Sequence, residues 1–218
     1  MSARPFFESD LIIVKNEIIE LGQEVITALS DAVAALAMRN TDLARTVVEH
    51  DISIDKKELE INNKAFLLIA KQQPVAKDLR RLVTALKIAS DLERMGDNAK
   101  NIARAALALG PSNPIALHPS ILKMEKNAIE MAELAIKAFA NEDLTLALKF
   151  CEMDDQIDDT YEQIVQELLT EQVANEEEMK HVMQMAFCAR YIERFADHVT
   201  NIAESVIFLV KGETFQFN

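Results

Sequence analysis

The chain has 218 residues, of which 50% are apolar and 27% charged. This balance excludes a disordered chain and allows one large core or two small ones. The net charge of −13 argues against nucleic acid as the main partner, because phosphate binding needs a basic face. Two cysteines are too few for a disulfide framework, and the N-terminal MSARPFFESD does not resemble a secretory signal. A cytoplasmic protein without a membrane-spanning segment is therefore expected.

The chain is predicted to be helical almost throughout. Apolar residues recur every three or four positions, and only four glycines and five prolines interrupt them. The helices are expected at residues 8–39, 42–71, 75–109, 120–140, 143–171 and 176–211. Three of the prolines and one glycine fall in GPSNPIALHP, residues 110–119, which is the best candidate for a linker.

The two halves of the chain repeat each other. LERMGDNAKNIA (92–103) and IERFADHVTNIA (192–203) share six of twelve residues, at an offset of 193 − 93 = 100. EHDISIDKKELEI (49–61) and EMDDQIDDTYEQI (152–164) share five of thirteen, at an offset of 152 − 49 = 103. The fold is therefore predicted to be all-α, with two tandem, duplicated three-helix bundles. They would comprise residues 1–109 and 120–218, on either side of the 110–119 linker.

Each matched segment carries two acidic residues four positions apart. The four pairs are Asp51 and Asp55, Glu93 and Asp97, Asp154 and Asp158, and Glu193 and Asp197. This spacing places both side chains on one helix face. With 36 acids in 218 residues, roughly six such pairs would arise by chance at helical spacing. The signal is the recurrence at equivalent positions in both halves.

The acid pairs are expected to border the apolar stripe of their helices. On a helical wheel Glu93 and Asp97 lie beside the stripe, and small residues such as Gly96 and Ala196 would let a neighbouring helix approach. Two pairs could then form a four-carboxylate cluster in each half. All-oxygen clusters select hard cations such as Mg, Mn, Ca or ferric iron, and sometimes zinc. The alternative is that the acids form solvated, salt-bridged faces.

Other candidate residues carry less information. His50 and His198 lie beside acidic pairs and are interpreted as surface residues, with completion of an asymmetric metal site as the alternative. Glu178 and His181 form one Glu-x-x-His motif, but a di-iron bundle needs two. Phosphate-loop, HExxH, CxxC and nucleophilic-triad patterns are absent from the sequence. An enzyme is therefore not expected, and a metal-dependent enzyme or metal store is the alternative.

PVAKDLRRLVTALKIASDLERMGDNAKNIA and FCARYIERFADHVTNIAE resemble the two repeats of the PhoU family, and the resemblance extends over nearly the whole chain. It implies two three-helix bundles in a cytoplasmic protein that acts as a negative regulator of the bacterial phosphate-starvation response. The implied partners are the sensor histidine kinase of the phosphate regulon, the ATPase of the phosphate ABC transporter and a second copy of the chain. Membrane contact would occur only through partners.

The resemblance also implies metal binding. The E(D)xxxD motifs of the family bind multinuclear metal clusters in some members. These motifs correspond to the eight acids Asp51, Asp55, Glu93, Asp97, Asp154, Asp158, Glu193 and Asp197. Fe, Mn, Mg, Zn and Ca remain open as the ion. Ala196 and His198 replace Gly96 and Asn98 of the first half, which leaves room for the two sites to differ in nuclearity or affinity.

Overall fold

The computed structural model describes residues 4–111, 117–147, 149, 151–170 and 175–214, and it is all-α. The described residues form seven helices. These are α1 (Arg4–Met38), α2 (Thr41–Gln72), α3 (Ala76–Leu109), α4 (Pro119–Asn141), α5 (Leu144–Ala147), α6 (Cys151–Thr170) and α7 (Glu176–Lys211). The expected helical class and the duplicated architecture are confirmed.

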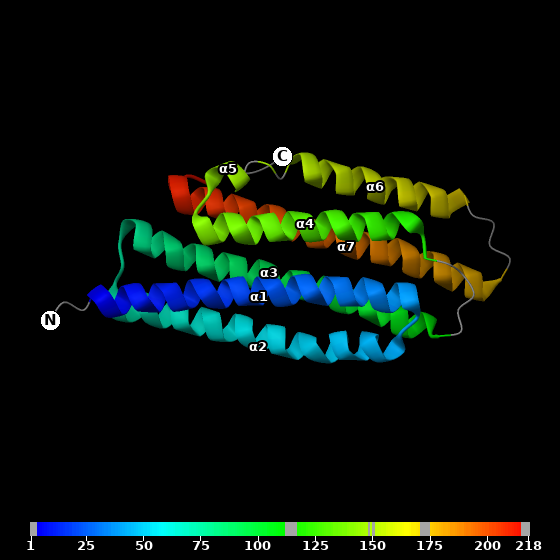
Figure 1. The fold of residues 1–218 in the computed structure, drawn as a ribbon, viewed down its shortest axis with the longest axis horizontal. Helices are drawn as coiled ribbons and strands as arrows, with labels where there is room; N and C mark the ends of the chain where they lie inside the picture. The colour runs from blue at the N-terminus through cyan, green and yellow to red at the C-terminus, as the bar shows by residue number, and fades with distance from the viewer. Residues whose placement is uncertain (1–3, 112–116, 148, 150, 171–174, 215–218) are drawn as a thin grey trace.

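The long helices run side by side along one axis and give an elongated molecule (Figure 1). In the first half α3 packs against both α1 and α2, and in the second half α7 packs against both α4 and α6. The halves meet along their length, where α3 packs against α7 and α1 against α4. Helices α3 and α7 are therefore central, and α2 and α6 lie on the outside.

Short connections with defined caps join the helices. Asn40 links α1 to α2, and its side-chain oxygen accepts hydrogen bonds from the backbone N–H groups of Asp42 and Leu43. These bonds satisfy amides that a helix start leaves unpaired. Pro119 begins α4 in the first turn, where its missing N–H costs nothing. At the far end of the chain Gly212 adopts a left-handed conformation, with φ of 78°, and ends α7.

The expected helix over 143–171 is the one that differs most from the structure. Asp143 caps the short helix α5 by accepting hydrogen bonds from the N–H groups of Thr145 and Leu146. Lys149 then donates a turn hydrogen bond to the carbonyl of Leu146, and α6 begins at Cys151. No glycine or proline lies between 143 and 151, so this interruption could not be predicted from helix-breaking residues.

One continuous apolar core joins the two halves. Its fully buried side chains include Leu21 in α1, Ile88 and Leu92 in α3, and Ile192 and Phe195 in α7. The small residues beside the acid pairs are buried as expected: Ala89, Ala103, Ala189 and Ala203. Small side chains at these positions allow close helix packing, so the acid pairs lie at the rim of a helix interface.

Helix α1 is long and apolar enough to cross a membrane, over Phe6–Met38. No such segment was expected from the sequence. However, 56% of the most apolar stretch of α1 is buried inside the protein. The apolar character of this helix is therefore that of a core helix, whose hydrophobic face packs against α2, α3 and α4.

Candidate functional site

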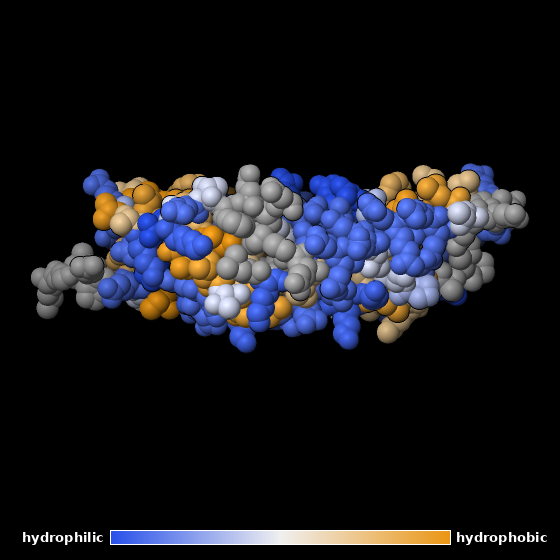
Figure 2. All heavy atoms as spheres, turned by 90° about the horizontal axis from the view of Figure 1, so that it is seen from above, coloured by the Kyte–Doolittle hydropathy of each residue, from blue (hydrophilic) through white to orange (hydrophobic). Residues whose placement is uncertain are grey.

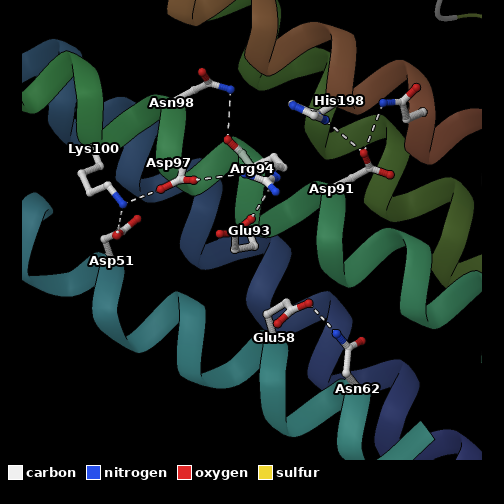
Figure 3. A network of polar contacts seen from close by, with 11 residues as sticks. Asp51, Glu58, Asn62, Asp91, Glu93, Arg94, Asp97, Asn98, Lys100 and His198 are labelled. Carbon is white, nitrogen blue, oxygen red and sulfur yellow. Dashed lines mark hydrogen bonds and ion pairs between the residues drawn. The ribbon is translucent and has the colours of Figure 1, made fainter. Parts of the chain in front are cut away.

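The acid pairs of α2 and α3 meet in the first half, and we call Asp51, Asp55, Glu93 and Asp97 the first cluster. Lys100 of α3 lies inside it (Figure 3). The Lys100 ammonium is 2.5 Å from Oδ2 of Asp51 on α2 and also donates to Oδ1 of Asp97. It therefore joins two helices through two carboxylates.

Lys100 is held in its charged form. Its side chain is only 15% exposed, and burial by itself would lower its pKa. The hydrogen bonds to Asp51 and Asp97 outweigh burial, so the pKa of Lys100 is raised above its ordinary value. A protonated amine therefore supplies a permanent positive charge within the first cluster.

The negative charges of Asp51 and Glu93 are only partly offset by neighbouring cations. Burial raises the pKa of Asp51 despite the contact with Lys100, and it raises the pKa of Glu93, with the Asp97 charge adding to the effect. The charge of Asp55 raises the pKa of both groups, which places Asp55 in the same cluster. Oδ1 of Asp51 is buried without a hydrogen-bond partner among the described residues.

Arg94 takes part in the first cluster from its exposed side. Its helix position faces it towards solvent, as the helical wheel indicates, yet its guanidinium reaches back (Figure 3). Nε lies 3.5 Å from Oε2 of Glu93, and Nη1 lies 3.9 Å from Oδ2 of Asp97. At this exposure such pairs contribute little to stability.

The acid pairs of α6 and α7 meet in the second half, and we call Asp154, Asp158, Glu193 and Asp197 the second cluster. One carboxylate oxygen each from Asp158, Glu193 and Asp197 lies within 4.8 Å of the others. Oδ1 of Asp154 and Oε2 of Glu193 are buried and have no hydrogen-bond partner among the described residues. This arrangement concentrates negative charge between two helices.

Burial and like charge both act on the second cluster, in which Glu193 is buried and Asp158 and Asp197 are exposed. Burial is the main cause that raises the pKa of Glu193 to about 7, and the neighbouring Asp197 adds to it. Burial, followed by the charges of Asp158 and Asp197, raises the pKa of Asp154 to about 6. Arg190 pairs with Oε1 of Glu193 but does not offset these effects. Like charges gathered at a desolvated rim favour protonation or a bound cation.

The residues of the second cluster fit a hard metal ion. They offer only carboxylate oxygens, which Mg, Mn and Ca prefer, and two of these oxygens are buried and unpaired. The first cluster has the same type of donor, but the Lys100 ammonium lies between Asp51 and Asp97. The structure therefore brings together the acids that the sequence singled out, while metal binding at them stays a prediction.

Sequence reasoning missed the basic residues of both clusters. Lys100 lies three positions after Asp97, and Arg190 three positions before Glu193, so both share a helix face with their acids. Glu58 was also missed; it contributes to the raised pKa of Glu93. Helical spacing could have identified these residues as neighbours. It could not have shown that Lys100 also reaches α2.

His198 is only partly exposed, with 19% of its side chain accessible, so its interpretation as a surface residue was only partly right. Its Nδ1 lies 3.0 Å from Oδ1 of Asp91, which also accepts a hydrogen bond from Asn201 at 3.2 Å (Figure 3). These contacts link α7 to α3 across the two halves. His50 is half-exposed, as expected, with Nε2 3.8 Å from Glu24. The role of His198 is thus explained by packing between the halves.

The chain matches the PhoU domain model twice, over residues 18–106 and 121–206. It is 34% identical over 216 residues to the phosphate-specific transport system accessory protein PhoU homolog of Clostridium acetobutylicum, covering 99% of both chains. It is 33% identical to the phosphate-specific transport system accessory protein PhoU of Escherichia coli, over 96% of this chain and 87% of that one. With the PhoU homolog of Caulobacter vibrioides it shares 38% identity over 95% of this chain and 90% of the relative.

Solved structures show the same fold. The phosphate transport system regulatory protein PhoU from Streptococcus pneumoniae superposes with a TM-score of 0.89 at 28% identity, over 97% of this chain and all of that one. PhoU from Pseudomonas aeruginosa gives a TM-score of 0.89 at 32% identity, over 95% of this chain and all of that one. The duplicated helices, the paired carboxylates and these matches agree, and the chain belongs to the PhoU family, a non-enzymatic family of accessory and regulatory proteins of phosphate-specific transport.

Proposed function

We propose that this protein is a regulatory adaptor of bacterial phosphate homeostasis and a negative regulator of the phosphate-starvation response. When phosphate is sufficient, it would hold the sensor histidine kinase of the phosphate regulon in a non-phosphorylating state, coupled to the ATPase of the phosphate ABC transporter. The observation that carries the proposal is the double PhoU domain match, which extends over both halves of the chain. The related proteins are named for phosphate-specific transport.

We propose that the protein works in the cytoplasm and reaches the membrane only through its partners. Its net charge of −13 opposes direct attachment to anionic lipids. Figure 2 shows broad hydrophilic areas between separate hydrophobic patches on one face of the molecule. Such a surface favours docking onto proteins over insertion into a bilayer.

A homodimer is part of the proposal. Ile52, Leu59 and Phe66 are all more than half exposed, and they recur every seven residues on α2. This spacing places the three side chains on one face of the outer helix of the first half. An exposed apolar stripe on an outer helix supports contact with a second copy of the chain.

The proposed function also includes metal binding at the two clusters. The eight acids would hold divalent or ferric ions between α2 and α3 in the first half and between α6 and α7 in the second. A bound ion supplies positive charge that joins the two helices and relieves the repulsion between their carboxylates. The buried, unpaired oxygens of Asp51, Asp154 and Glu193 support this role.

Deleting the gene tests the adaptor role. Phosphate-starvation genes should then stay expressed in high phosphate, and the wild-type gene supplied in trans should restore repression. The complemented strain also allows affinity purification of the tagged protein with the kinase and the transporter ATPase. Normal repression in the deletion strain would contradict the proposed role.

A further inference from the structure

The two clusters differ at a pair of equivalent residues that contribute to their charge. At the offset of 100 that relates α3 to α7, Lys100 of the first half corresponds to Thr200 of the second. Lys100 brings a positive charge to Asp51 and Asp97. The Thr200 hydroxyl donates to the carbonyl of Ala196 at 3.3 Å, and a hydrogen bond from Thr200 also acts to lower the pKa of Asp154, but Thr200 brings no charge. The repeat has thus kept the carboxylates and changed what neutralises them.

In the first cluster the Lys100 ammonium occupies the position between Asp51 and Asp97 that a bridging cation would otherwise take. Its ammonium contacts one carboxylate from α2 and one from α3, so it already joins the two helices. A metal ion placed between the same carboxylates would lie within a few ångströms of the ammonium, where two positive charges repel strongly. The Lys100 side chain, which is mostly buried, would have to move out of the cluster before a metal ion could bind there.

In the second cluster Asp154 and Asp197 correspond to the two acceptors of Lys100, and the most buried acid is Glu193. Glu193 is only 8% exposed, and its Oε2 has no hydrogen-bond partner among the described residues. One carboxylate oxygen of Glu193 lies within 4.8 Å of one oxygen each from Asp158 and Asp197. A buried carboxylate oxygen without a partner is costly unless a cation or a proton satisfies it.

Arg190 does not bridge carboxylates of two helices, as Lys100 does in the first cluster. Its guanidinium contacts Glu193 on its own helix and lies 5.7 Å from the ring centroid of Tyr161. Its side chain is 47% exposed. Arg190 therefore reaches α6 through the Tyr161 ring and pairs with only one of the four carboxylates, so it does not join carboxylates of α6 and α7.

We propose that the two halves are unequal metal sites, in which the second cluster binds the ion tightly and Lys100 acts as a built-in cation that closes the first cluster. The inference rests on the metal role proposed above and specifies where that role is carried out. Lys100 is then a specificity-determining residue: its ammonium joins carboxylates of α2 and α3 without metal, whereas the carboxylates of α6 and α7 have no such bridge among the described residues.

A reciprocal exchange of Lys100 and Thr200 tests the proposal. The full chain, stripped with chelator and dialysed, would be titrated with Mn²⁺ alone by calorimetry, and bound Mn²⁺ would be counted by elemental mass spectrometry. Asp97→Asn and Asp197→Asn locate the binding. Tight binding in the wild type should disappear in Asp197→Asn and persist in Asp97→Asn.

The exchanged variants should move the site. Lys100→Thr should add a second tight binding class, and the further change Asp97→Asn should remove it. Thr200→Lys should weaken tight binding by about 100-fold or more, because it places an ammonium against the second cluster. Lys64→Thr is the matched control: Lys64 pairs with Glu17 away from both clusters, so its loss should leave Mn²⁺ binding unchanged.

The outcomes separate this inference from the proposed function. If Asp97→Asn and Asp197→Asn each remove an equal share of tight binding, the inequality is wrong and the metal role stands. If no variant binds Mn²⁺ tightly, the inequality and the metal role both fail, while the adaptor role still depends on the gene deletion. Should Lys100→Thr fold poorly by circular dichroism, Thr200→Lys and the two asparagine variants decide the question.

Discussion

Lys100 has a structural role that can be measured without any metal. Its ammonium is the main compensation for Asp51, whose carboxylate is almost wholly buried at the interface of α2 and α3. When one member of a buried ion pair is removed, the other is left charged or must take up a proton. Because both partners lie at the rim of the helix interface, the expected cost is below that of a pair in a deep interior.

We therefore expect Lys100→Met, measured in the presence of chelator, to lower the free energy of unfolding by about 1–3 kcal/mol. Methionine keeps most of the apolar stem, so the loss reports on the charge. Urea denaturation followed by circular dichroism provides the measurement. Lys64→Met removes an exposed lysine and should cost less than about 0.5 kcal/mol. Equal small losses in both variants would contradict the role given to Lys100.

At the scale of elements, the contact between α1 and α4 depends on one glycine. A Cβ atom placed on Gly22 of α1 would lie 2.5 Å from Cδ1 and 2.8 Å from Cγ1 of Ile136 on α4. These distances are shorter than van der Waals contact, so an alanine would push the two helices apart or move the isoleucine. The glycine thus permits the close approach of the first helices of the two halves.

Gly22→Ala should therefore lower the free energy of unfolding by about 1–2 kcal/mol, although alanine favours a helix by roughly 1 kcal/mol. The helix gain should appear once the crowding is removed, so Gly22→Ala should be less harmful, or stabilising, in an Ile136→Ala background. A double-mutant cycle by urea denaturation measures this coupling. Additive effects of the two changes would show that the close contact does not limit packing.

A second connection between elements is ionic. Glu142, directly after α4, accepts from Nζ of Lys77 at 2.7 Å and from Nη2 of Arg81 at 3.0 Å, both in the first turns of α3. Burial by itself would raise the pKa of Glu142, but the hydrogen bonds from Lys77 and Arg81 outweigh it and lower the pKa below 4.5. The folded state therefore favours the ionised carboxylate.

The sign of the pH dependence follows from that lowered pKa. The contribution of Glu142 to stability is fully present above its ordinary pKa of 4.5 and is lost as the pH falls through the lower folded value. At pH 7 Glu142→Gln should cost about 1–2 kcal/mol. The difference between wild type and variant should shrink below pH 4.5 in urea titrations. A difference that stays constant down to acid pH would contradict the ionic contribution.

At the scale of the whole molecule, the two repeats share a core. Buried residues of α1 and α3 belong to the same apolar cluster as those of α4 and α7, and the halves pack side by side in Figure 1. A half on its own would expose the apolar surface that now lies between α3 and α7. The division into residues 1–109, 110–119 and 120–218 therefore describes the repeat, and as a division into domains it stays a prediction.

We expect the full chain to unfold in one cooperative transition, with equal calorimetric and van't Hoff enthalpies. Fragments 1–109 and 120–218, expressed alone, should show reduced helicity or self-association, because each lacks the surface that covers its third helix. Scanning calorimetry and analytical ultracentrifugation supply the measurements. Two resolved transitions, or monomeric fragments with full helicity, would contradict a shared core.

The sequence by itself determined the helical class, the duplication and the four acid pairs. Helical periodicity arises between residues one turn apart, and the repeat places Glu93 and Glu193, or Asp51 and Asp154, at equivalent positions, so both are visible in the chain. Only the tertiary structure decided that Lys100 reaches Asp51 on another helix, that His198 contacts Asp91 in the other half, and that a break separates α5 from α6. The contacts of Lys100 and His198 depend on how the helices cross and on where long side chains extend, and neither is fixed by spacing along one helix.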